Sequence, residues 1–269
     1  GAYVPPDSVL PPGLMEGVTR VRAKKFRGMY SEGLLLPAPE GSKLGDDVAE
    51  QLGVTHWEPV PEVHGAEVAS PPPAGGPVYK LENARRASSI WPIGMELVIT
   101  EKIHGQNWRA MFDGENFHVG SRTTWKKEGD GTNLWWQCLT EQIKHLLRIY
   151  PNHTLYGEQY GMVGKFPYDV AKGTRMVRAF DMSHGRTFID FGDLQARCHT
   201  FGVPTVPDLG RVKWTGELDY LNPYAEGKTT LGGRHIREGA VVRPMSESRD
   251  ENGDRRVLKL IGRGYLAKG

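Results

Sequence analysis

The sequence has no long apolar run, and none of its stretches approaches the roughly 18–20 apolar residues that a bilayer-spanning helix needs. Net charge is also small, because 34 Lys and Arg nearly balance 32 Asp and Glu and leave +2 at pH 7. The two cysteines, Cys138 and Cys198, form no C-x-x-C pair, which argues against a disulfide scaffold and a cysteine-rich zinc site. The N-terminal residues carry no signal-peptide pattern. We therefore expect a cytoplasmic protein with reduced thiols and no contact with a membrane.

Glycine and proline are abundant instead, with 34 Gly and 19 Pro in 269 residues. Such a composition favours many turns, many short strands and at least one linker. Residues 61–77, PEVHGAEVASPPPAGGP, are typical of a polyproline linker that ends flexibly. The predicted organisation is a small β-rich unit over residues 1–60, this linker over 61–77, and one large domain over 78–269.

The large domain carries an alternation of strands and turns. Two runs flank Asp113-Gly114, a strong turn signal, and predict a hairpin over 108–112 and 116–120. Apolar spacing predicts one helix over 134–148 and another over 193–201. Further strands are expected over 96–101, 154–160, 176–181, 239–243 and 256–261. The fold class is therefore α+β with a mainly antiparallel sheet.

Four charged residues stand on or beside these strands: Lys102, Glu158, Glu238 and Lys259. Each one alone is typical of a solvated side chain in a turn or on the outer face of a strand. Their order along the chain, Lys-Glu-Glu-Lys, is more informative than any single member. A partly buried lysine is a candidate nucleophile, and paired carboxylates are candidate ligands for a divalent cation.

With its neighbouring residues, this series resembles the covalent nucleotidyltransferases, which include ATP-dependent polynucleotide ligases and mRNA capping enzymes. The matching motifs, in chain order, are K-x-x-G at Lys102–Gly105, Ser121-Arg122 at a strand end, Tyr156–Glu158, Arg178–Asp181, E-G-h-V at Glu238–Val241 and h-K-h at Leu258–Leu260. More narrowly, the segments TEKIHGQNWR and LKLIGRGYL look like those of the Deinococcus-type RNA ligases. The resemblance implies an ATP-grasp-like nucleotidyltransferase domain preceded by a small, partial OB-fold β module, since residues 18–60 resemble the closing part of that module.

The number of residues after the last motif helps to choose between an RNA ligase and a capping enzyme. Ten residues follow Lys259 (269 − 259), which leaves no room for the OB domain that capping enzymes place after it. An ATP-dependent RNA ligase that seals 3′-hydroxyl and 5′-phosphate ends through a lysyl–AMP intermediate is the leading interpretation. A GTP-dependent capping-type transferase and a non-catalytic RNA-binding module are the alternatives.

The resemblance also implies roles for individual residues. Lys102 would attack ATP and carry AMP, while Glu158 and Glu238 would hold Mg²⁺ or Mn²⁺. The other nucleotide contacts implied are Glu101 with the adenine amino group, Gly105 in the turn, Asn107 and Arg122 with the ribose, Phe180 stacked on the base, and Lys259 on the α-phosphate. Two positions depart from the family pattern: Ile261 replaces a second motif lysine, and His104 replaces an aspartate.

The expected partners are RNA ends, with the choice between a nicked duplex and a single-stranded break left open, and the expected state is a monomer. Phosphate contacts are predicted for Arg20, Arg22 and Lys24, which alternate along one strand, and for Arg122. Lys126 and Lys127 lie near Trp125, Trp135 and Trp136, a cluster suited either to stacking on bases or to packing on the helix over 134–148.

Overall fold

The computed structural model describes residues 2–3, 20–21, 24–26, 29–31, 38–44, 46–49, 51–52, 55–56, 68–129, 133–161 and 166–268. The chain divides into two compact units, one of residues 1–63 with 263–269 and one of residues 64–262. Within the described residues, no helix combines the length and the apolar character that crossing a bilayer requires.

The smaller unit contains short strands. Strands β2 (Arg20–Val21), β1 (Ala2–Tyr3) and β5 (Thr55–His56) pair in that order, and β3 (Lys24–Phe26) pairs with β4 (Met29–Ser31). Helix α6 (Arg263–Lys268) also belongs to this unit. The described residues of the basic segment expected as one strand fall in β2 and β3, whereas Arg22 lies outside the described residues. The OB-fold prediction for this region stays a prediction.

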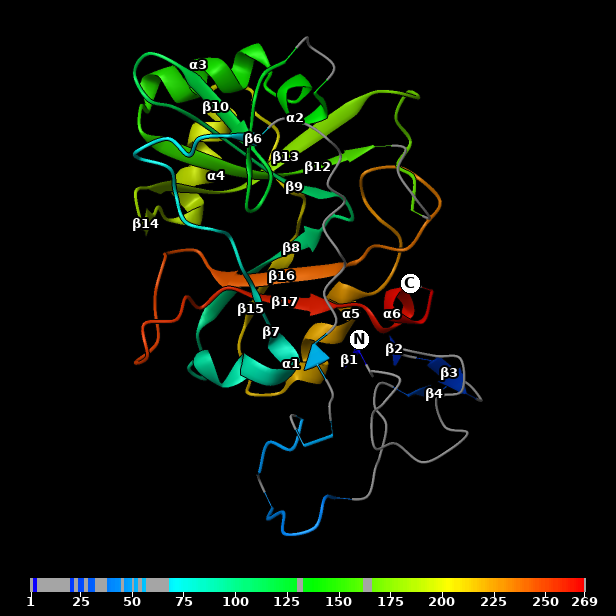
Figure 1. Ribbon diagram of the computed structural model, residues 1–269. Helices are drawn as coiled ribbons and strands as arrows, with labels where there is room; N and C mark the ends of the chain where they lie inside the picture. Colours follow the sequence, from blue (N-terminus) through cyan, green and yellow to red (C-terminus); the bar gives the residue numbers. More distant parts are fainter. Residues whose placement is uncertain are drawn as a thin grey trace. The chain divides into compact units, whose positions relative to one another are not determined.

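The larger unit is built on two sheets (Figure 1). The seven-stranded sheet has the order β14 (Thr187–Phe188), β13 (Arg175–His184), β12 (His153–Gly161), β9 (Gln106–Phe112), β10 (Phe117–Gly120), β11 (Trp125–Lys126) and β6 (Val68–Ala69). The five-stranded sheet has the order β15 (Asp208–Lys213), β8 (Glu96–Lys102), β16 (Gly239–Pro244), β17 (Leu258–Ile261) and β7 (Glu82–Asn83). All of these pairs are antiparallel except β17 with β7, so the predicted α+β class with mainly antiparallel sheet is confirmed.

Helices cover each sheet and supply its core. Helices α3 (Glu141–Ile149) and α4 (Phe191–Thr200) bury their apolar faces with the seven-stranded sheet. Helices α1 (Ala84–Ala87) and α5 (Asn222–Ala225) pack with the five-stranded sheet, where Trp91 and Trp214 meet edge to face. Two short 3₁₀ turns, η1 (Ser88–Ile90) and η2 (Leu218–Leu221), complete this layer.

The single helix predicted over 134–148 is wrong. The structure has α2 (Leu134–Gln137) and α3 as separate helices. The reason is local: the Thr140 side chain accepts a hydrogen bond from the Ile143 backbone N–H and so begins a new helix. The predicted hairpin is confirmed, because β9 and β10 pair antiparallel on either side of Asp113 and Gly114, which has φ of +107°.

In the tryptophan cluster, Trp125 and Trp135 are buried, whereas Trp136 is partly buried. Trp125 and Trp135 are 5% and 6% exposed, and the Trp135 indole N–H donates to the Asn107 carbonyl. The Lys126 ammonium lies over the Trp135 ring, 4.9 Å from its centroid. These rings therefore present little surface on which a base could stack.

Residues 68–83 are built into the larger unit. The segment starts as edge strand β6 of one sheet and ends as edge strand β7 of the other. Between them, the Gly76 N–H donates to Thr154 Oγ1 at 2.9 Å and Tyr156 Oη donates to the Pro77 carbonyl at 2.9 Å. The proline-rich stretch is thus held by the seven-stranded sheet from residue 68 onward, while the predicted domain boundaries stay a prediction.

Candidate active site

Strand pairing brings the candidate nucleophile and one carboxylate together. Glu238 directly precedes β16, and Gly239 at the start of that strand pairs with Lys102 at the end of β8. The Lys102 Nζ atom consequently lies 2.8 Å from Glu238 Oε1, with the two side chains 23% and 16% exposed. A partly shielded ion pair of this kind is stronger than one on the open surface.

The second carboxylate, Glu158, lies on β12 of the seven-stranded sheet, next to the tight turn that follows Lys102. Residues 103–105 join β8 to β9, and Gly105 lies directly against the backbone of Gln159 on β12. A Cβ at residue 105 would overlap the Gln159 carbonyl oxygen, so only glycine fits this approach. A Cβ at residue 105 would also come within 3.1 Å of Glu158 Cγ, so the Glu158 side chain lies beside the turn that follows Lys102.

Lys259 lies on the same face of the five-stranded sheet as Lys102. Lys259 pairs with Val241, and Val241 pairs with Thr100, which is two residues before Lys102. Cross-strand partners and residues two apart share one face of a sheet. Ile261, where the family pattern has a second lysine, lies in the Lys102 row of that face because both residues pair with Gly239.

The charges of this cluster shift one another's pKa values. Burial raises the pKa of Glu158 to about 8, a rise that Glu238 reinforces and that Lys102 and Arg122 oppose. Burial lowers the pKa of Lys259, as does the positive charge of Lys102. These couplings show that the four candidate side chains, with Arg122, form one electrostatic unit.

The pKa of Lys102 moves opposite to what a nucleophile needs. Burial works to lower it, but the charges of Glu238 and Glu158 outweigh burial and raise it above the ordinary lysine value. With no cation on the carboxylates, the ammonium form is therefore favoured. The Lys102 ammonium is held by its ion pair with Glu238, and the two carboxylates favour its protonated form.

Glu101 is buried and already has partners. Its Oε1 atom accepts from the Thr229 hydroxyl at 2.5 Å, and its Oε2 atom accepts from the Thr230 hydroxyl at 2.7 Å and from the Thr230 N–H at 2.9 Å. A contact with an adenine amino group would have to compete with these bonds. Neither threonine carried any motif signal in the sequence, because each lies far along the chain from Glu101.

Asn107 and Phe180 come from the seven-stranded sheet. Asn107 pairs with Glu158, so both side chains share a face, and its Oδ1 atom is buried without a hydrogen-bond partner among the described residues. Phe180 is the extra residue of a bulge, since Tyr156 pairs with Asp181 and Gly157 pairs with Ala179. An orphaned acceptor and a bulge are both features that accompany ligand sites.

His104 packs into an aromatic group that sequence reasoning missed. The His104 N–H donates to the Tyr168 hydroxyl at 2.8 Å, and the His104 ring meets Phe166 edge to face at 5.1 Å. His235 lies against Tyr168 at 4.6 Å between ring centroids. Burial lowers the pKa of His104, so its neutral form is favoured. Tyr168 and His235 lie in loops, where no periodic pattern marked them.

Taken together, the geometry defines a class of protein. A lysine amine beside two carboxylates, with a second lysine on the same face, has the parts needed for attack at phosphorus: a nucleophile, ligands for a divalent cation and positive charge for phosphate oxygens. This set, at the junction of two mainly antiparallel sheets, is that of a nucleotidyltransferase.

The chain belongs to the RNA ligase family, whose model matches residues 95–261 and so spans all four charged residues of the site. Among solved structures, the chain is similar to an RNA ligase of Naegleria gruberi. One variant of that ligase, with ATP and Mn, has 24% identity and a TM-score of 0.77, covering 93% of this chain and 77% of that one. The same ligase with PPi has 24% identity and a TM-score of 0.74, covering 93% and 76%. This likeness shows the fold; no curated protein matches the chain.

Proposed function

We propose that this RNA ligase uses ATP and seals 3′-hydroxyl and 5′-phosphate ends of RNA through a lysyl–AMP intermediate. The observation that carries the proposal is the Lys102 amine held 2.8 Å from Glu238, with Glu158 and Lys259 in the same electrostatic unit. Relatives of the same fold have been solved with ATP and Mn and with AMP and Mn, which supports the choice of nucleotide.

The residues present fit the nucleotide. The orphaned Asn107 Oδ1 atom offers an acceptor for a ribose hydroxyl, and the bulge at Phe180 offers an aromatic ring for the base. Arg122, whose charge acts on both Glu158 and Lys259, is the proposed contact for the ribose or a phosphate. Lys259 supplies positive charge for the α-phosphate.

The two carboxylates fit a divalent cation that also binds phosphate. Among the described residues, no three His, Cys, Asp or Glu side chains gather closely enough to hold a metal ion by themselves. Mg²⁺ commonly takes one or two carboxylates and fills its other positions with water and substrate phosphates, and Glu158 and Glu238 supply that number. When bound, the cation supplies positive charge that disfavours the ammonium form of Lys102.

In the first step, the neutral Lys102 amine attacks the α-phosphorus of ATP, and pyrophosphate leaves. The AMP then passes to the 5′-phosphate of an RNA end, which frees Lys102. Attack of a 3′-hydroxyl on that end forms the phosphodiester bond and releases AMP. Because each step is an in-line displacement, the chain contributes mainly position and charge neutralisation.

The N-terminal unit is proposed as the OB-type module of a Deinococcus-type ligase that repairs broken RNA. Arg20 and Lys24 lie on β2 and β3 of that unit, and with Arg22 and Arg122 they are the proposed phosphate contacts. A monomer that acts in the cytoplasm on nicked or broken RNA stays part of the proposal.

The test is the mass of the intact protein after incubation with ATP and Mn²⁺. Wild type should gain the mass of one AMP, and Lys102→Ala should gain none. Lys80→Ala removes an exposed lysine of the same unit and should behave as wild type. A gain with GTP but not ATP would favour a capping-type transferase, and no gain with either nucleotide would favour a non-catalytic RNA-binding module. A labelled RNA with one 5′-phosphate and one 3′-hydroxyl end then tests sealing itself.

A further inference from the structure

The bulge at Phe180 is tied to the five-stranded sheet by one arginine. Arg243 Nη1 donates to the Phe180 backbone carbonyl at 3.0 Å and lies 3.1 Å from Asp181 Oδ2. Arg243 lies on β16, which begins one residue after Glu238 and pairs with the strand of Lys102. The guanidinium therefore joins the strand next to that of the candidate nucleophile to the residue expected to stack on the base.

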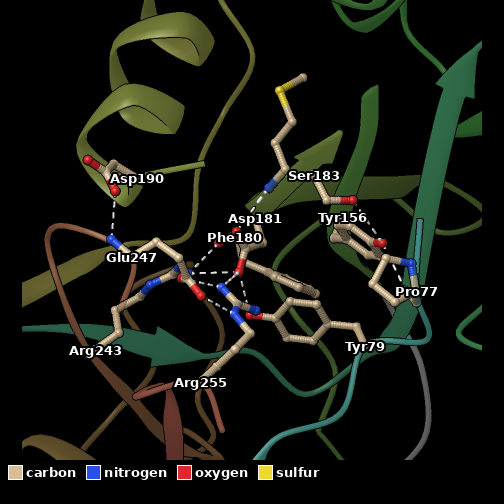
Figure 2. Close-up of polar contacts among 11 residues, drawn as sticks. Pro77, Tyr79, Tyr156, Phe180, Asp181, Ser183, Asp190, Arg243, Glu247 and Arg255 are labelled. Carbon is tan, nitrogen blue, oxygen red and sulfur yellow. Dashed lines mark hydrogen bonds and ion pairs between the residues drawn. The ribbon is translucent and has the colours of Figure 1, made fainter. Parts of the chain in front are cut away.

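Asp181 is the centre of a buried polar cluster (Figure 2). Its Oδ2 atom accepts hydrogen bonds from the Tyr79 hydroxyl at 2.7 Å and from Arg255 Nη2 at 2.9 Å, and it forms an ion pair with Arg243. Glu247 accepts two bonds of 2.6 Å from Arg255, which balances the second guanidinium. Asp181 and Arg243 are 1% and 2% exposed, so this charge pair is shielded from water.

The cluster also backs the Phe180 ring. The Tyr79 ring lies 4.8 Å from the Phe180 ring with an interplanar angle of 57°. Its hydroxyl is fixed by Asp181, and Figure 2 shows Tyr79, Arg243 and Arg255 converging on that carboxylate next to Phe180. One cluster thus holds both the backbone carbonyl and one side of the ring of Phe180.

A buried ion pair is a weak source of stability, because desolvation offsets most of its attraction. Its contacts do fix geometry, since the planar guanidinium of Arg243 holds Nη1 between the Asp181 carboxylate and the Phe180 carbonyl. A bulge leaves a residue without a strand partner and re-aims its side chain, so its position needs such outside bonds. The placement of an expensive cluster at this bulge therefore favours a positioning role over a purely stabilising one.

We propose that Arg243 and Tyr79 are positioning residues for the adenine of ATP: they hold the Phe180 bulge at the distance from Lys102 that the nucleotide requires. This inference rests on the proposed function, because it concerns how the same site orients its nucleotide. Neither residue is assigned to bind ATP or the metal directly.

The test compares Arg243→Lys and Tyr79→Phe with wild type in forming the AMP adduct at varied ATP. A lysine keeps a positive charge for Asp181, but it lacks the planar guanidinium that holds Nη1 at both Asp181 and the Phe180 carbonyl. We expect Arg243→Lys to raise KM for ATP by about ten-fold, the size of one lost hydrogen bond from a charged group, with a small change in the maximal rate. Tyr79→Phe should raise KM by about three-fold, as a neutral bond is weaker.

A spectroscopic readout separates positioning from stability. The triphosphate of 2-aminopurine riboside is fluorescent, and stacking on an aromatic ring quenches it. Wild type should quench the bound probe fully, and Arg243→Lys should quench it much less at saturating probe. Arg211→Lys, a change at an exposed arginine paired with Asp208 on the same sheet, is the matched control and should alter neither KM nor quenching.

Unchanged KM and unchanged quenching in Arg243→Lys would overturn the inference while wild type still forms its adduct. Failure of wild type to form an adduct would instead overturn the proposed function, so the two failures are distinct. Should Arg243→Lys fold poorly, Tyr79→Phe, which removes a single hydroxyl, carries the test alone.

Discussion

Lys102 Nζ lies 2.8 Å from Glu238 Oε1 because Gly239, the next residue, pairs with Lys102 across β8 and β16. The close packing of β16 against β17 at residue 239 needs a glycine, since a Cβ there would overlap the Leu260 carbonyl oxygen. One strand pairing thus joins Lys102, the proposed nucleophile, to a carboxylate that raises its pKa. Beside Glu238 and Glu158, Lys102 therefore favours its charged form.

Glu238→Gln should make the Lys102 amine more reactive in the absence of nucleotide and metal. Removing the charge removes a main cause of the raised pKa, so more of the amine is neutral at pH 8. Peptide mass spectrometry after brief treatment with an acylating reagent should show faster labelling of Lys102, with Lys80 as the internal control. Equal labelling of Lys102 in both proteins would contradict the pKa argument. The same variant should lose AMP adduct formation, because it lacks a proposed metal ligand.

Glu158→Gln should flatten the pH dependence of stability in metal-free protein. The folded-state pKa of Glu158 is raised to about 8, against about 4.3 for an unfolded chain. The folded state therefore binds the proton more tightly, and stability falls as pH rises from about 4.3 to about 8. Glutamine mimics the protonated acid, so the variant should have the higher Tm at pH 8.5.

Thermal unfolding between pH 5 and 9 checks this prediction, and parallel slopes for the two proteins would refute it. Added Mn²⁺ provides a second check. It should raise the Tm of wild type most at pH 8.5, where binding must displace least proton, and should raise that of Glu158→Gln less.

Local patterns explain which parts of the fold were predictable. The strand over 96–101 is rich in β-branched residues. The turn residues Asp113-Gly114 mark the hairpin of β9 and β10 by their chemistry alone. The helix over 134–148 was misjudged because apolar spacing continues across the break, whereas the break is made by a single cap at Thr140. The packing of residues 68–77 on the sheet was equally hidden, because its partners Thr154 and Tyr156 lie far along the chain.

The candidate site also contains residues that the sequence predicts and residues that it does not. Lys102, Glu158, Glu238 and Lys259 carried a recognisable order, and the structure brings them together. The residues that contact Glu101 and those that surround Asp181 formed no recognisable motif series along the sequence. An arginine inside the strand GAVVRP was the available signal for Arg243, since a charge among β-branched residues needs a buried partner. Pairing across sheets is a tertiary property that spacing does not encode.

Gly105→Ala should disable the site by separating its two sheets. The added methyl group would overlap the Gln159 carbonyl, which is backbone and cannot rotate away. We expect a loss of about 1–3 kcal/mol in unfolding free energy and a severe loss of adduct formation. Gly192→Ala is the matched control. Gly192 lies in the first turn of α4, and an added methyl group there meets only the flexible end of the Met245 side chain. This variant should be neutral or slightly stabilising. Wild-type adduct formation in Gly105→Ala would show that the turn tolerates the shift.

Glu101 has two candidate roles, to anchor the 229–230 loop and to read the adenine amino group of ATP. Both of its carboxylate oxygens are bonded by Thr229 and Thr230, and the side chain is 1% exposed. Thr229→Val keeps the shape and removes one donor, so it should lower the unfolding free energy by about 1–3 kcal/mol in urea denaturation. Glu101→Gln should show a similar loss, because one of its atoms becomes a donor facing the Thr donors.

The role in nucleotide choice is read from adduct formation with ATP and with inosine triphosphate, which lacks the adenine amino group. If the carboxylate anchors the 229–230 loop, both variants lose stability and keep the wild-type preference for ATP, and this is the result we expect because its two oxygens already accept three hydrogen bonds. If Glu101 reads the amino group, Glu101→Gln alone loses the preference while Thr229→Val keeps it. Because stability and preference are measured separately, a folding defect cannot imitate a change in base recognition.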